Sequence, residues 1–175
     1  MKIIDILKIL QEQIHTTVVA TNDKSGKSVT CAIDIIDYDE KGLYFLTAIG
    51  KNFYKRLKAN GYLSLTGIKG DNTLSCIAVS VCGKVKEIGS ERLKRLLDKN
   101  PYMYEIYPTE QARKALTLFC LYEGQGEWFD LSKKPIKRFS FSLGGTRTKT
   151  DKYIITDACV GAEGVFPCVR KIVFC

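Results

Sequence analysis

The residues with the clearest chemical potential lie where a strand-like segment passes into a helix-like one, in the run Leu43–Leu57 (LYFLTAIGKNFYKRL). Thr47 contributes a hydroxyl group and Lys51 an ammonium group, while Gly50 permits the turn between them. We expect the helix to begin near Asn52, with that side chain as its N-cap. The first turn of a helix offers unpaired N–H groups and the positive end of the helix dipole. The segment therefore predicts a phosphate-binding site. An ordinary capped helix with an exposed lysine is the alternative that spacing leaves open.

The chain has a single histidine, His15, at the junction of the expected first helix and first strand. A Ser–His–Asp triad would have to use it, yet no G-x-S-x-G motif is present. Sites that hold a metal with two or more imidazoles are excluded, and neither a Walker loop nor G-x-G-x-x-G occurs. The motifs typical of hydrolases and of nucleoside triphosphatases are thus absent from this sequence. We expect a structural role for His15, with a place at a pocket rim as the alternative.

Seven cysteines are present, and four of them lie in apolar, strand-like runs where burial as small hydrophobic residues is expected. These four are Cys31, Cys76, Cys82 and Cys120. An odd number of cysteines without a secretory signal disfavours a disulfide framework.

Length and composition are those of a soluble globular domain: 175 residues, 45% hydrophobic and 26% charged. The net charge of +8 favours an anionic ligand, but the basic residues are spread along the chain, so nucleic acid is not the expected partner. No apolar run reaches the roughly 20 residues of a membrane span. Lys2, Asp5 and Lys8 interrupt the opening segment, which argues against a signal peptide. We expect a cytoplasmic protein without a membrane partner.

The pattern of apolar residues predicts a mainly β protein with inserted helices. The expected helices are Met1–Ile14, Asn52–Ala59 and Glu91–Asn100. The expected strands are Thr16–Thr21, Ser28–Asp37, Leu43–Thr47, Tyr62–Ile68, Leu74–Glu87 and Ala115–Leu131, with a bulge at Gly83. Because the strands follow one another instead of alternating with helices, a small antiparallel barrel fits better than a doubly wound sheet.

Five segments, in this order, resemble the pyridoxamine 5′-phosphate oxidase-like FMN-binding split barrels, most closely the branch of nitroimidazole-resistance-type reductases. The segments are HTTVVAT (15–21), the run 26–65 from GKSVTC to GYLSL, SVCGKVKEI (80–88), LDKNPYMYEIYP (97–108) and GEWFDL (126–131). The resemblance implies a six-stranded antiparallel split β-barrel that forms a homodimer. It also implies one FMN in each of two clefts at the dimer interface.

The same resemblance implies which residues contact the cofactor. The isoalloxazine ring would run along Ser28, Val29, Thr30 and Cys31. The ribityl phosphate would be held by Leu46, Thr47, Lys51 and Asn52, and Trp128 of the partner would close the cleft. Many relatives carry arginines where this chain has Ser28 and Thr30, and Lys27 or Lys55 are candidates to replace that charge.

The activity implied is that of an FMN-dependent oxidoreductase acting on a small organic substrate, of nitroaromatic or pyridoxal type, with NAD(P)H or another electron donor. Because FMN carries the electrons, the protein need not supply a catalytic base, and none is assigned. Thr30 or a neighbouring backbone N–H would stabilise the reduced flavin. The alternative is a non-catalytic flavin- or haem-binding carrier or sensor on the same barrel.

We expect three regions: a barrel domain (1–142), a Gly-rich linker (143–152) and a tail (153–175). The tail resembles a degenerate half of a bacterial ferredoxin, with the pattern C-x₂-C-x₂-C-x₃-C-P. Cys159 occupies the first ligand position, but Ala162, Val165 and Val169 stand at the other three, and Cys168 is one residue early. We therefore expect neither an iron–sulfur cluster nor another metal, and a tail that packs on the barrel.

Overall fold

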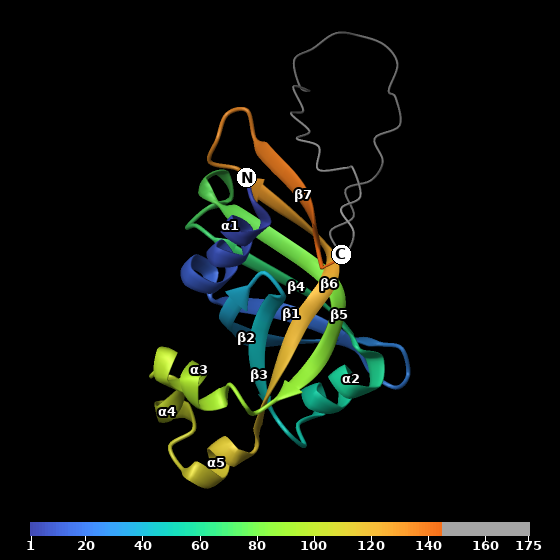
Figure 1. The fold of residues 1–175 in the computed structure, drawn as a ribbon. Coiled ribbons are helices and arrows are strands. Elements are labelled where there is room, and N and C mark those ends of the chain that lie inside the picture. The colour runs from blue at the N-terminus through green and yellow to red at the C-terminus, as the bar shows by residue number, and fades with distance from the viewer. Residues whose placement is uncertain (145–175) are drawn as a thin grey trace.

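Six antiparallel strands close a barrel in the computed structural model, which describes residues 1–144 (Figure 1). The strands are β1 (Thr16–Asn22), β2 (Ser28–Asp39), β3 (Gly42–Ala48), β4 (Tyr62–Lys69), β5 (Ile77–Gly89) and β6 (Leu116–Asp130). Their order is β3-β2-β1-β4-β5-β6, and pairing between β3 and β6 closes the sheet on itself. The predicted six-stranded antiparallel barrel is confirmed.

A seventh strand, β7 (Lys137–Leu143), was not predicted. It pairs with the second half of β6, from Gly124 to Asp130, whereas the first half of β6 pairs with β3. Its alternation buries Phe139, Phe141 and Leu143. β7 ends one residue beyond the proposed 1–142 domain. Apart from residues 143 and 144, the predicted linker and tail lie outside the described residues.

Two groups of helices occupy opposite ends of the barrel (Figure 1). The expected first helix comprises α1 (Ile3–Lys8) and a π-helical segment, η1 (Ile9–Ile14), and α1 lies beside β7. At the other end lie α2 (Asn52–Asn60) and the short helices α3 (Leu93–Lys99), α4 (Met103–Ile106) and α5 (Glu110–Lys114). A 3₁₀ turn, η2 (Thr73–Ser75), precedes β5. The sequence did not predict α4 and α5, which are too short to show a clear helical period.

Two helix starts differ from the prediction. The third expected helix begins at Leu93, and Ser90 accepts the Leu93 N–H through its backbone carbonyl. In α2 the N-cap position belongs to Lys51, and Asn52 is the first helical residue. Asn52 cannot cap a helix from within it, because an N-cap residue lies outside the helical conformation.

The main core fills the barrel and continues beneath α1 and α2. Phe45 and Phe119 stack at its centre with ring centroids 5.9 Å apart, and Ile6 and Leu10 seal the α1 end. A second cluster packs α3 and α4 on β3 and β6 through Leu96, Met103, Tyr44 and Leu118, among others. This packing fixes α4 beside the ends of β2 and β3.

Two glycines allow β5 and β6 to approach closely. Gly83 lies opposite Gly124, and a Cβ atom added at Gly83 would stand 2.2 Å from the carbonyl oxygen of Glu123. The register does not shift at Gly83, where the bulge was predicted: the extra residues are Tyr122 of β6, opposite Lys84 and Val85, and Ile88 of β5, between Glu87 and Gly89. Together these features let the long strands bend around the barrel.

Candidate binding cleft

The barrel is split between β2 and β3. The two strands pair from Asp39 and Gly42 only as far as Ile35 and Phe45, whereas β2 stays paired with β1 back to Ser28. The N-terminal half of β2 therefore has one open edge. Ile35 donates its N–H to the His15 carbonyl on the β1 side (2.8 Å). Because backbone groups alternate along an antiparallel strand, those of Thr30, Ala32 and Asp34 point to the open edge.

A cleft of about 300 Å³ lies in this split. Its lining comes from β1, β2, β3, the start of α2, and α4 with the residue after it: Thr16, Cys31, Ala32, Ile33, Asp34, Ile36, Leu46, Thr47, Lys51, Phe53, Met103, Ile106 and Tyr107. Most of these side chains are apolar, and the charged groups among them are one ammonium and one carboxylate. Apolar walls with a few placed polar groups are typical of small-molecule sites.

The ammonium end of the cleft is built by the turn from β3 into α2. Gly50 has φ +94°, a conformation that favours glycine, and this turn brings Lys51 to the N-cap of α2 beside Thr47. No side chain caps this helix, and its first turn contains no acidic residue. The N–H groups of the first turn and the Lys51 charge therefore favour an anion at this end.

A second cation reaches the same region from α2. Arg56 donates to the Thr21 hydroxyl (2.7 Å), and its charge acts on the thiol of Cys31. Burial raises the pKa of Cys31 above its usual value, while Arg56 and Lys51 partly oppose that shift. The thiol therefore stays protonated near neutral pH. Lys27, Lys55 and Arg56 do not line the cleft, but Arg56 is, with Lys51, a cation whose charge acts on the lining residue Cys31, which favours Arg56 over the two lysines as a replacement for the absent arginines.

The structure brings together four of the nine residues assigned from the resemblance: Cys31, Leu46, Thr47 and Lys51 all line the cleft. The others do not line it. Ser28, Val29 and Thr30 continue β2 along the open edge, and Asn52 follows Lys51.

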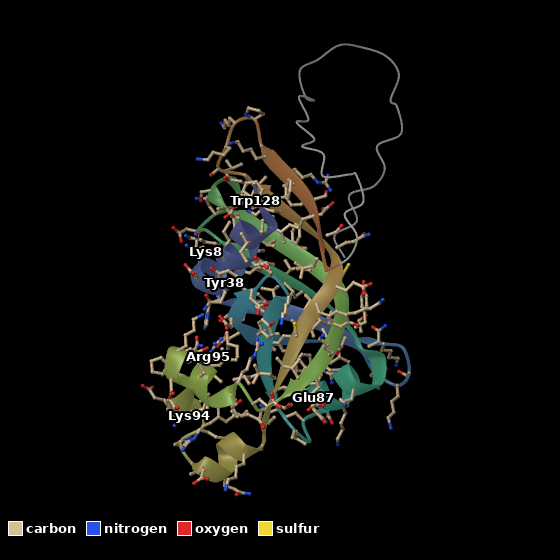
Figure 2. All side chains as sticks on the ribbon, in the orientation of Figure 1. Lys8, Tyr38, Glu87, Lys94, Arg95 and Trp128 are labelled. Carbon is tan, nitrogen blue, oxygen red and sulfur yellow. The ribbon has the colours of Figure 1, made fainter. Side chains whose placement is uncertain are left out.

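Trp128 lies in the other half of β6, at the end of the molecule where β7 is found, far from Glu87 near α2 (Figure 2). It is 5% exposed and belongs to the main core, where its indole N–H has no hydrogen-bond partner among the described residues. Its proposed contact with a partner's cleft remains a prediction.

Sequence reasoning missed the far side of the cleft. Thr16 and Asp34 come from neighbouring positions on β1 and β2, and Met103, Ile106 and Tyr107 come from α4 and its end. The sequence feature that could have indicated Met103, Ile106 and Tyr107 is the tyrosine-rich run 102–107. This run is part of the family resemblance, but no role was assigned to it. Only the packing of α3 and α4 on β3 and β6 brings this run to the split.

His15 lies directly behind Asp34. Its Nε2 is 2.8 Å from the Tyr102 hydroxyl and 3.7 Å from Asp34 Oδ2, and Nδ1 is 3.2 Å from the Gln11 carbonyl. The Tyr102 hydroxyl donates to Asp34 Oδ2 (3.0 Å), and Thr16 donates to Oδ1 (2.7 Å). Two hydrogen bonds, through the Tyr102 hydroxyl, thus connect His15 to the lining residue Asp34.

Two other features bear on the class of site. Within residues 1–144, no group of three or more potential metal ligands lies together. No helix in that part of the chain has the length and apolar character required to cross a bilayer.

Solved structures share this fold at low sequence identity. A NimC/NimA family protein from Clostridium acetobutylicum is 16% identical, with a TM-score of 0.64, over 80% of this chain and 89% of its own. A pyridoxamine 5′-phosphate oxidase-related, FMN-binding protein from Nostoc punctiforme is 11% identical, with a TM-score of 0.57, over 86% of this chain and 91% of its own. A haem-binding protein from Mycobacterium smegmatis is 10% identical, with a TM-score of 0.57, over 79% of this chain and 56% of its own. These likenesses support the barrel.

Sequence comparison identifies the family directly. No curated protein matches the chain closely enough to count as a relative. The family model described as pyridoxamine 5′-phosphate oxidase matches residues 5–123, which include β1 to β5, the short helices and the first half of β6. That match covers more than half of the sequence and every residue that lines the cleft. The chain belongs to the pyridoxamine 5′-phosphate oxidase family.

Proposed function

We propose that the cleft binds FMN and that the protein is an oxidoreductase that uses this flavin as redox centre for a small organic substrate. The observation that carries the proposal is the split itself, which joins an anion-binding turn to an apolar slot. Lys51 and the uncapped start of α2 suit a terminal phosphate. The slot beside the open edge of β2 suits a flat ring.

The chain's own groups would bind and orient the flavin. The Lys51 ammonium would balance the phosphate charge, with Thr47 as a hydroxyl donor beside it. Backbone N–H groups of Thr30, Ala32 and Asp34 lie on the open edge, where they would donate to the polar rim of the ring. When bound, FMN supplies the electron transfer, so the protein needs no nucleophile of its own.

A second copy of the chain is the expected partner, because charged side chains lie only at the edges of the outer face formed by four adjacent strands: Asp34 opposite Thr16, and Lys84 opposite Tyr62. Alternate residues of β1, β2, β4 and β5 form this face: Thr16, Val18, Ala20, Thr30, Ala32, Tyr62, Ser64, Thr66, Ile68, Ala78, Ser80 and Cys82. Val18 and Ile68 are 56% and 62% exposed at its centre and edge. Thr16 and Ala32 also line the cleft, so a partner on this outer face would stand beside the ligand.

The direct test is a titration of the purified protein with FMN, followed by flavin fluorescence and by the visible absorbance spectrum. We expect saturable quenching at about one FMN per chain and a dimer by light scattering. Absence of saturable binding would overturn the proposal. Reduction of the bound flavin by NAD(P)H, followed by reoxidation with a nitroaromatic compound, tests the oxidoreductase activity.

The alternative is a carrier or sensor that binds flavin or haem without turnover. It is motivated by the haem-binding protein of Mycobacterium smegmatis, which shares the fold. The carrier hypothesis predicts cofactor binding with no reduction by NAD(P)H and no substrate reduction. Titration with haemin distinguishes the two cofactors: a Soret band that shifts and saturates at one haem per chain would favour haem.

A further inference from the structure

Behind the cleft, three hydrogen-bond contacts run in series through His15. They join the Gln11 carbonyl to Nδ1 (3.2 Å), Nε2 to the Tyr102 hydroxyl (2.8 Å), and that hydroxyl to Asp34 Oδ2 (3.0 Å). The series connects η1, β2 and the residue that precedes α4. Among the described residues, Tyr102 and Asp34 are the titratable groups for which a contact with the imidazole is found.

The number of hydrogens in this series can be counted. A carbonyl and an ionised carboxylate only accept, so the three contacts require three hydrogens. A neutral imidazole supplies one and the tyrosine hydroxyl supplies another. The series is complete only when it holds a third proton. That proton lies either on His15, with Asp34 ionised, or on Asp34, with His15 neutral.

Tyr102 is suited to pass a proton without keeping a charge. Burial, together with the negative charge of Asp34 and its hydrogen bond, raises the pKa of Tyr102 well above its usual value. The hydroxyl therefore stays protonated near neutral pH. His15 is also held in an unusual backbone conformation, with φ +64° and ψ −67°, and its N–H is bonded to the Leu10 carbonyl (2.8 Å). This geometry fixes the imidazole at the end of the series.

We propose that His15, Tyr102 and Asp34 form a proton-holding chain that delivers one proton to the substrate that the flavin reduces in the cleft. The inference rests on the proposed function, because it requires a substrate that takes up a proton when it is reduced. Asp34 lines the cleft and would meet the ligand, whereas His15 and Tyr102 act through it. The side chain of His15 is 32% exposed, so solvent can restore its proton.

The transfer balances in two stages. First, the Nε2 proton moves to the Tyr102 oxygen while the hydroxyl proton moves to Asp34 Oδ2, which leaves a neutral imidazole and a protonated carboxyl. The carboxyl O–H bond then breaks, its electron pair stays on Asp34, and the proton forms a bond to a heteroatom of the ligand. The electrons for the reduction come from the flavin, and His15 takes a new proton from water.

Because His15 is the only histidine, one imidazole spin system reports on the chain in a ¹H–¹⁵N correlation spectrum of the labelled protein without FMN. We expect the imidazole ¹⁵N signals of Asp34→Asn and of Tyr102→Phe to differ from those of the unchanged protein at the same pH, because each variant removes one contact of the series. Tyr104→Phe is the matched control, since Tyr104 donates to the exposed Asp98 instead. A purely structural role would change stability and leave the imidazole signals of all four proteins alike.

Delivery to the ligand is tested by the anaerobic reoxidation of photoreduced, FMN-loaded protein with nitrofurazone, in H₂O and in D₂O. We expect the rate to fall as the pH rises and to be lower in D₂O than in H₂O. Tyr102→Phe should lower the rate about tenfold or more and abolish that pH dependence, while FMN affinity stays unchanged. Equal rates in Tyr102→Phe and Tyr104→Phe would overturn delivery. If FMN does not bind, the proposed function is wrong, and the imidazole spectrum still decides whether the chain holds a proton.

Discussion

At the scale of single residues, the anion end of the cleft depends on a backbone turn more than on the number of cations. The chain carries 27 lysine and arginine residues, yet Lys51 is the one whose side chain lines the cleft within residues 1–144. Gly50 adopts the positive φ that places it there. Lys55 lies one turn further along α2, is exposed, and does not line the cleft.

This difference gives a prediction for the two lysines. Lys51→Ala should weaken FMN binding about ten- to a hundredfold, because a hydrogen bond to a charged group contributes roughly 1.5–3 kcal/mol. Lys55→Ala carries the same change in net charge and should bind within about twofold of the unchanged protein, since Lys55 does not line the cleft. Fluorescence titration measures both. Equal losses in the two variants would mean that only the overall charge matters.

At the scale of elements, one carboxylate joins α2 to two strands of the barrel. Glu87 of β5 accepts hydrogen bonds from Lys58 (3.0 Å) and Tyr54 (3.4 Å) of α2 and from Thr117 (2.8 Å) of β6. Figure 2 shows Glu87 at the end of the barrel where α2 lies. Burial alone would raise its pKa, but the hydrogen bonds from Lys58 and Thr117 outweigh burial and lower it below 4.5. The anchor that positions α2 is therefore ionised at neutral pH.

A carboxyl group whose pKa is lower in the folded than in the unfolded state stabilises the folded state at pH values above its unfolded-state pKa. This contribution is lost as the pH falls through the folded-state pKa. The free energy of unfolding should therefore fall below about pH 4.5. Glu87→Gln should be less stable at pH 7 and should show a shallower decline in this acid range. Urea unfolding at several pH values measures the effect. Glu105→Gln, at an exposed position on α4, is the control and should keep the full decline.

At the scale of the whole molecule, the outer face of β1, β2, β4 and β5 adjoins the cleft. Thr16 and Ala32 are shared by both, so a partner that covers the face also changes the walls of the cleft. One protomer leaves the cleft open beside this face. If the proposed dimer forms on this face, the second copy completes the walls of the cleft.

A charge at the centre of the face should separate the copies without unfolding either one. Val18→Lys places an ammonium group on β1 where the side chain is 56% exposed. We expect a monomer by light scattering, an unchanged circular dichroism spectrum, and FMN binding weakened at least tenfold, because a charge buried in an interface carries a large desolvation cost. Ile136→Lys is the control, since Ile136 is similarly exposed but lies between β6 and β7. A Val18→Lys dimer that binds FMN normally would place the interface elsewhere.

Much of this architecture could be predicted from local sequence. Alternating apolar residues identified six strands, because side chains on a strand point to opposite faces in turn. Gly50 and Lys51 identified the anion turn, because glycine permits a positive φ and a helix start favours anions. The alternation in Phe139, Phe141 and Leu143 carried the same signal for β7 and was overlooked.

Local sequence was therefore enough to predict six strands, three helices and the chemistry of one turn, since these depend on residues close together in the chain. Only the tertiary structure decided where β2 and β3 part, that Arg56 acts on Cys31, and that His15, Asp34 and Tyr102 meet. His15 and Tyr102 are 87 residues apart. Their contact depends on barrel closure and on the packing of α3 and α4 on β3 and β6, and no local periodicity encodes that arrangement.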